Sequence, residues 1–210
     1  MNSHGADLPA PGAAPRDDGP LGMWVFLASE ILFFGALLLA YGWSRVHFPA
    51  GFGLASRHTD ALLGTINTAL LLTSSAAVAA AAGLAREAGQ ERIVARLLWG
   101  AATLGVLFLA IKGLEYRHEW QEHLFPGAGF ALADTPGAEM FFAFYFTATA
   151  LHALHLAIGI GVLGVLAVGA ERRRQWASAG RLEVAGLYWH FVDVVWIVLY
   201  PLLYLVNRHP

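Results

Sequence analysis

The chain has 210 residues, of which 57% are hydrophobic and 13% charged, and its mean hydropathy is +0.55. Soluble domains of this length are far less apolar, so the composition indicates a membrane protein. The net charge of -2 provides no basic surface for nucleic acid. The sequence contains no cysteine, which excludes disulfides, thiolate metal sites and a thiol nucleophile.

The first twenty residues read MNSHGADLPAPGAAPRDDGP and are rich in Pro, Gly, Ala and Asp. They contain no apolar segment of the kind that a signal peptide needs. We interpret residues 1–20 as a flexible tail and residues 21–210 as one membrane domain.

Five apolar runs then approach or exceed the roughly 20 residues that a helix needs to cross a bilayer. They cover Leu21–Tyr41, Ala61–Leu84, Leu97–Leu114, Met140–Val168 and Val184–Val206. None has the alternating pattern of an outer-membrane strand. The sequence therefore predicts an all-α, polytopic membrane protein built as a bundle of five transmembrane helices.

Arginines in the connections predict the orientation, because positively charged loops stay on the side where the chain is made. An inner N-terminus would place eight on that side: Arg16, Arg86, Arg92, Arg96, Arg172, Arg173, Arg174 and Arg181. The outer side would have four: Arg45, Arg57, Arg117 and Arg208. We expect the N-terminus inside and the C-terminus outside, with Lys112 at the end of a span and counted for neither.

Small residues in two runs predict close helix packing. The fourth run contains Gly159, Gly161 and Gly164, and the second contains the segment SSAAVAAAAG. Small side chains let helix backbones approach each other in lipid. These surfaces could meet within the chain or on another subunit, although glycine is common in membrane helices in general.

Six ionisable side chains fall within or at the edges of the predicted spans, where facing lipid at mid-depth would cost about 2.5–3.5 kcal/mol each. They are Glu30, Glu115, His152, His155, His190 and Asp193. Residues three apart share a helix face, so the two histidine-containing pairs should each point into the bundle. Glu30 and Asp193 lie at similar depth, about 14 Å from the inner helix ends, and could meet. Glu115 lies near an outer end and could be interfacial.

Three kinds of site could use these groups. Carboxylates and imidazoles can form a di-iron or haem site, but the Glu-x-x-His motif at Glu115 and His118 occurs once, at a membrane edge. They could instead relay protons in an enzyme or transporter, although no repeat or broken helix pair marks a transport site. The third possibility is structural, with hydrogen bonds between helices worth about 0.6–2 kcal/mol each.

Four segments resemble subunit III of the haem-copper terminal oxidases, best known as cytochrome c oxidase subunit III. They are WVFLASEILFF (Trp24–Phe34), KGLEY (Lys112–Tyr116), LHALHLAIG (Leu151–Gly159) and YWHFVDVVWIVLYPLLYL (Tyr188–Leu205). They occur in family order and resemble the shorter, five-helix bacterial form. The resemblance implies a bacterial inner membrane, with a cytoplasmic N-terminus and a periplasmic C-terminus.

The resemblance also implies a subunit without catalytic residues, metal or other redox centres of its own. Haem and copper would belong to the catalytic subunit I, with subunit II as a further partner and phospholipid bound between helices. Glu30 matches a buried, protonatable carboxyl that reacts with carbodiimides. The other matching positions of the bundle interior and lipid cleft are Glu115, His152, His155, His190, Asp193 and Trp196. Family members support proton uptake and protect the oxidase, which reduces dioxygen to water and pumps protons, from inactivation during turnover.

Two other functions stay open at this point. An accessory subunit of nitric oxide reductase shares this fold and many of these motifs, and a membrane-embedded metal-binding protein is the more distant alternative. The sequence does not distinguish quinol from cytochrome c as electron donor, because other subunits decide it.

Overall fold

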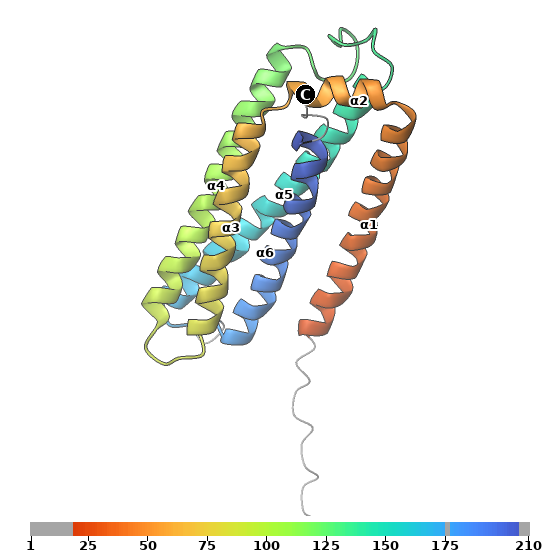
Figure 1. Ribbon diagram of the computed structural model, residues 1–210. Coiled ribbons are helices and arrows are strands. Elements are labelled where there is room, and N and C mark those ends of the chain that lie inside the picture. Colours follow the sequence, from red (N-terminus) through yellow and green to blue (C-terminus); the bar gives the residue numbers. More distant parts are fainter. Residues whose placement is uncertain (1–18, 175–176, 206–210) are drawn as a thin grey trace, which may run out of the picture.

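A computed structural model of the chain describes residues 19–174 and 177–205, and within these ranges it contains helices, turns and loops but no strand (Figure 1). The long helices are α1 (Gly19–His47), α3 (Ala61–Leu84), α4 (Glu91–Gln121), α5 (Ala138–Glu171) and α6 (Ala179–Tyr200). Each is long and apolar enough to cross a membrane. The predicted all-α fold with five membrane-spanning helices is confirmed. Residues 1–18 of the predicted tail lie outside the described residues.

The helices extend beyond the apolar runs that predicted them, most clearly in α4. Its predicted span, Leu97–Leu114, is continued by the charged segment ERIVAR at the start and by EYRHEWQ at the end. Hydropathy measures the length that crosses hydrocarbon, whereas backbone hydrogen bonding continues the helix into the interface.

A short helix that hydropathy did not predict, α2 (Pro49–Ala55), is followed by the 3-10 turn η1 (Ser56–His58) and joins α1 to α3. A proline begins α2, where its missing N–H needs no partner. Phe52 is fully buried against the rings of Tyr41 and Phe141, at centroid distances of 5.3 and 5.7 Å. Gly51 fits where a Cβ would lie 2.1 Å from the Pro136 carbonyl oxygen, so α2 rests directly on the chain before α5.

Helices α3, α4, α5 and α6 pack as one group, in which α4 lies between α3 and α5 and α6 packs on both of those helices. Helix α1 contacts α5 and α6 and stands on the side of the bundle away from α4 (Figure 1). Much of its apolar surface is therefore exposed in the isolated chain: Leu21, Trp24, Val25, Ile31, Leu32, Phe33, Leu39, Trp43 and Val46. Lipid or another subunit must cover this face in a membrane.

Trp189 of α6 is the central packing residue of the four-helix group. It is fully buried, and its indole N–H donates to the Ser74 hydroxyl of α3 at 3.1 Å. A Cβ added at Gly159 of α5 or at Gly105 of α4 would lie only 2.9 or 3.0 Å from its ring. The glycines thus allow one large side chain to contact three neighbouring helices.

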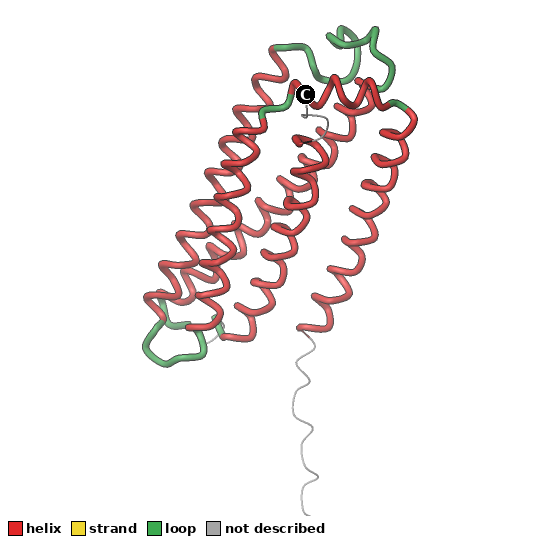
Figure 2. Tube along the Cα trace, viewed as in Figure 1, coloured by secondary structure: helices red, strands yellow, loops and turns green. Residues whose placement is uncertain are grey.

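The loops divide the bundle into two ends, as the trace in Figure 2 shows. The start of α1, the turn between α3 and α4, and the connection between α5 and α6 lie at the same end (Figure 2). We call it the arginine-rich end, after Arg86, Arg92, Arg96, Arg172, Arg173, Arg174 and Arg181. At the opposite end, α6 stops at Tyr200, and Pro201 begins a wider, π-helical turn, η2 (Pro201–Leu205).

Candidate functional site

The carboxyl of Glu30 on α1 faces the imidazole of His155 on α5. Glu30 Oε2 lies 3.3 Å from His155 Nε2, and the two side chains are 19% and 14% exposed. His155 Nδ1 lies 2.8 Å from the Leu151 carbonyl oxygen. A carbonyl can only accept, so Nδ1 carries a hydrogen and Nε2 is the atom that meets Glu30. A proton between these two atoms would make a hydrogen bond that joins α1 to α5.

The backbone around this pair is tied to α6. The hydroxyl of Tyr188 donates to the His155 carbonyl oxygen at 2.9 Å, and its ring lies 6.0 Å from that of Phe26 on α1. The ring of Phe34 packs edge-on to His155, with centroids 5.6 Å apart. Helices α1, α5 and α6 thus converge at the Glu30–His155 pair.

His190 and Asp193 form a second polar contact, between α6 and α3. His190 Nδ1 lies 2.6 Å from the Ser75 hydroxyl, within hydrogen-bond distance. Asp193 also lies near Ser75, but its two buried carboxyl oxygens have no hydrogen-bond partner in the described part of the chain. Glu30 and Asp193 do not meet, because Glu30 faces α5 and Asp193 faces α3.

His152 lies three residues from His155 on the same helix but in a different environment. It is 1% exposed and packs between Phe108 of α4 and Trp196 of α6, with ring centroids 5.4 and 5.1 Å away. Neither ring nitrogen has a hydrogen-bond partner among the described residues. The indole N–H of Trp196 instead donates to Thr68 of α3 at 3.0 Å. His152 is therefore a packing residue of the apolar core in this chain.

Glu115 belongs to a buried charged cluster near the end of the bundle opposite the arginine-rich end. The ammonium of Lys112 lies 3.0 Å from Glu115 Oε2 and 2.6 Å from the Tyr145 hydroxyl, and it also donates to the Tyr204 hydroxyl. Tyr145 donates in turn to Glu115 Oε1 at 3.0 Å. Glu115 is buried within the protein, since its side chain is 4% exposed. The aromatic rings of α5 and η2 cover it.

Lys112, Tyr145 and Tyr204 were not predicted as members of a site. Lys112 and Glu115 are three residues apart on one helix, a spacing that could have suggested the ion pair. The two tyrosines come from α5 and η2, at separations of 33 and 92 residues from Lys112. No local pattern links them to it.

The Glu-x-x-His motif does not act as one unit. Glu115 is buried in this cluster, whereas His118 is exposed and lies 3.6 Å from Glu122 at the surface. In residues 19–174 and 177–205, no group of three or more His, Asp or Glu side chains is placed to hold a metal ion. Several polar residues instead join pairs of helices, namely Glu30 with His155 and Ser75 with His190.

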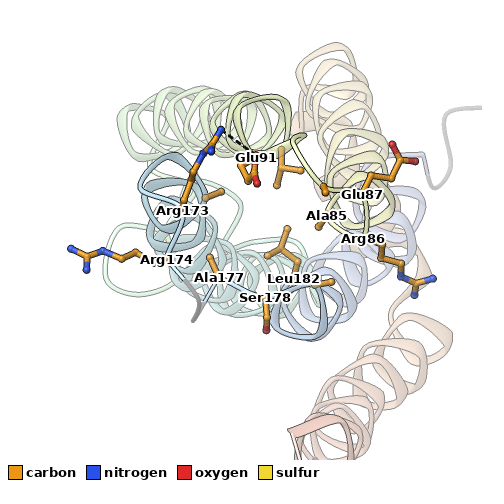
Figure 3. A pocket seen from close by; sticks show the side chains of 13 residues that line it. Ala85, Arg86, Glu87, Glu91, Arg173, Arg174, Ala177, Ser178 and Leu182 are labelled. Carbon is orange, nitrogen blue, oxygen red and sulfur yellow. Dashed lines mark ion pairs between the residues drawn. The ribbon is translucent and has the colours of Figure 1, made fainter.

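A pocket of about 360 Å³ lies at the arginine-rich end, between the α3–α4 turn and the connection from α5 to α6 (Figure 3). Arg173 reaches toward Glu91 at 3.8 Å, and Arg86 pairs with Glu183 at 2.5 Å. Figure 3 shows that Arg174 points away from the pocket. The arginines of this pocket are thus paired with carboxylates or directed outward.

Comparison with known proteins supports the resemblance seen in the four motifs. The chain matches the family described as cytochrome c oxidase subunit III over residues 16–207. The chain belongs to this family. Among subunit III relatives, cytochrome c oxidase subunit 3 of Thermostichus vulcanus is 34% identical over 90% of this chain and 87% of its own length. Quinol oxidase subunit 3 of Bacillus spizizenii is 29% identical over 89% of this chain and 86% of its own.

One subunit III relative is a longer, fused protein. The haem-copper oxidase subunit I+III of Aeropyrum pernix is 33% identical over 91% of this chain, which spans only 23% of the fused protein. The remainder of that protein is therefore outside the likeness. In the fused relative, as in the separate ones, the similarity covers about nine tenths of the present chain.

Proposed function

We propose that this chain is the non-catalytic third subunit of a haem-copper terminal oxidase in a respiratory chain. The observation that carries the proposal is the subunit III match over residues 16–207, together with relatives named as subunit 3 of both cytochrome c and quinol oxidases. A multi-pass membrane subunit of this family works in a complex with other subunits. The oxidase as a whole would reduce dioxygen to water and pump protons.

The haem and copper would be held by the catalytic subunit I, and subunit II would complete the complex. The fused subunit I+III relative supports a position of this chain directly beside subunit I. The polar groups of the described spans make contacts between helices, as expected of a supporting subunit. The exposed apolar face of α1 offers a surface for phospholipid, or for a neighbouring subunit.

We place the chain in a bacterial inner membrane with its arginine-rich end in the cytoplasm. The gathering of seven arginines at that end of the bundle supports this orientation, since positive segments remain on the cytoplasmic side. The N-terminus would then be cytoplasmic and the C-terminus periplasmic. Glu30 and His155 would lie within the membrane, near the lipid-facing helix α1.

The same proposal assigns the chain two supporting tasks, namely rapid proton uptake by the catalytic subunit and its protection during turnover. The purified oxidase should be compared with and without this chain. Removal of the chain should leave haem content unchanged, lower the rate of dioxygen reduction under conditions where proton uptake limits it, and make activity decay after fewer turnovers. Immediate loss of haem or of all dioxygen reduction on removal would contradict a supporting role. A complex that reduces nitric oxide instead of dioxygen would contradict the proposed reaction.

A further inference from the structure

The ammonium of Lys112 has all its hydrogens in use. It carries three N–H donors, and they meet Glu115, Tyr145 and Tyr204. The ammonium is also within 4.4 Å of the centroid of the Tyr145 ring, a favourable position for a cation. Lys112 is thus a fully satisfied charge in the interior of the chain.

Glu115 balances that charge completely. Its Oε2 accepts from Lys112 and its Oε1 accepts from the Tyr145 hydroxyl. Lys112 and Glu115 together form a neutral, hydrogen-bonded pair, the form in which buried charges are tolerated. Lys112 therefore has no N–H left to donate to a further carboxyl in the same space.

Glu119, one turn further along α4, is such a carboxyl. It is 2% exposed, and both of its oxygens are buried without a hydrogen-bond partner in the described residues. The Tyr145 hydroxyl lies near it as well, but the single hydrogen of that hydroxyl is directed to Glu115. An ionised Glu119 would be an unbalanced buried charge, whereas a protonated Glu119 is neutral.

A pocket connects this position to the surface. It measures about 610 Å³, and Glu115 and Glu119 lie in its wall between α4 and the segment that joins η1 to α3. The charged and titratable groups of the remaining wall are Arg57, His58, Asp60 and His118. The groups that act on Glu119 from its own helix are Lys112, Glu115 and Glu122, with Tyr145 of α5 beside it. The hydroxyl of Tyr204, from η2, accepts a hydrogen bond from Lys112 in the same cluster.

We propose that Glu119 is a proton-binding site that exchanges its proton with water through this pocket, at the bundle end opposite the arginine-rich end. Binding of one proton completes the charge balance of the cluster, in which Lys112 and Glu115 already neutralise each other. A metal ion fits the site poorly, because the described residues offer no group of three ligands here. The proton is thus the ligand that these donors and acceptors favour.

The covered position of the carboxyl gives the site a kinetic signature. Both oxygens of Glu119 are buried, so exchange of its hydrogen for deuterium should be slower than exchange at the partly exposed carboxyl of Glu122. Ala61 lies in the pocket wall at the start of α3. A larger side chain at this position should narrow the path.

The test is infrared spectroscopy of the intact oxidase complex, which detects the carbonyl band of a protonated carboxyl and its shift in heavy water. The difference between the infrared spectra of the wild type and of Glu119→Gln should contain one such carbonyl band. The matched control Glu122→Gln, from the same helix, should leave the band in place. In Ala61→Phe the band should persist and its heavy-water shift should become several-fold slower.

Each result decides the proposal. A wild-type spectrum that matches that of Glu119→Gln would overturn protonation of Glu119. Loss of the carbonyl band in Glu122→Gln would assign the band to Glu122 and also overturn the proposal. An unchanged rate of the heavy-water shift in Ala61→Phe would overturn the pocket as the route. If Glu119→Gln fails to assemble, the rate measured in Ala61→Phe still tests the exchange, because this variant leaves the Glu119 carboxyl in place.

Discussion

Glu30 and His155 form the contact of this chain that is best suited to hold a proton near lipid. The hydrogen on His155 Nδ1 is directed to the Leu151 carbonyl, so only Nε2 is available to Glu30, at 3.3 Å. A neutral carboxyl beside a neutral imidazole requires no buried charges, whereas the ion pair must offset the desolvation of both groups.

Replacement of His155 by Phe should therefore increase carbodiimide labelling of Glu30. Carbodiimides react with protonated carboxyls, and Glu30 would lose the base that can take its proton. Labelling should disappear in Glu30→Gln, and His118→Phe, which changes an exposed histidine, should give the wild-type profile. A wild-type profile that is flat with pH, or labelling that survives in Glu30→Gln, would contradict this account.

The residues of the candidate site were predictable by type but only partly by partner. Intramembrane position alone identified Glu30, His155, His190 and Asp193 as interior groups. Their partners depend on how the helices rotate about their axes and cross one another, and hydropathy carries no information about these angles. Glu30 thus pairs with His155 rather than meeting Asp193. Lys112 was placed at the end of a span, and its hydroxyl partners could not be predicted because they are distant in sequence.

The helices themselves were more predictable than the contacts between them. Apolar length identified all five spans, because the bilayer imposes one thickness on each. It could not identify α2, a seven-residue element held by the burial of Phe52 and the close approach at Gly51. It also could not rank the glycines of α5. Gly159 touches Trp189, whereas Gly161 has no atom within 4 Å of an added Cβ.

Gly159→Ala should destabilise the packing of α5 on α6, and Gly161→Ala should not. The added methyl at Gly159 would lie 2.9 Å from the ring of Trp189, which is enclosed and cannot move away freely. Overpacking of this kind costs about 1–3 kcal/mol. The midpoint of thermal unfolding of the two variants in detergent measures the difference. Equal midpoints would show that the glycine contact carries no packing role.

The contact between α3 and α6 should be held in part by Ser75 and His190. Their hydrogen bond, 2.6 Å long, joins two helices that are distant in sequence. A double-mutant cycle with Ser75→Ala and His190→Ala should give a coupling free energy of about 0.6–1.7 kcal/mol, typical of such bonds in membranes. Additive effects would mean that the two side chains do not stabilise each other.

Asp193 supplies a separate check on the same helix. Its side chain is buried beside Ser75, so Asp193→Ala should weaken retention of this subunit by the oxidase in detergent. The exposed Val194 provides a matched control as Val194→Ala. Wild-type retention in both Asp193→Ala and His190→Ala would contradict a structural role for this polar pair.

The molecule as a whole has one well-packed side and one incomplete side. The group of α3 to α6 buries its own core around Trp189, while α1 leaves a broad apolar face without partners among the described residues. Such a surface is expected of a subunit whose remaining contacts are supplied by lipid and by other chains. The membership in the subunit III family agrees with this incomplete burial.

The most direct test of the central proposal is purification of the native complex through a tag on this chain, followed by analysis of haem, copper and dioxygen reduction. We expect the chain to co-purify with a subunit that contains haem and copper and reduces dioxygen to water. We also expect the separated chain to contain neither group. Isolation of the chain without a haem-copper partner, or of a complex that reduces nitric oxide but not dioxygen, would contradict the account.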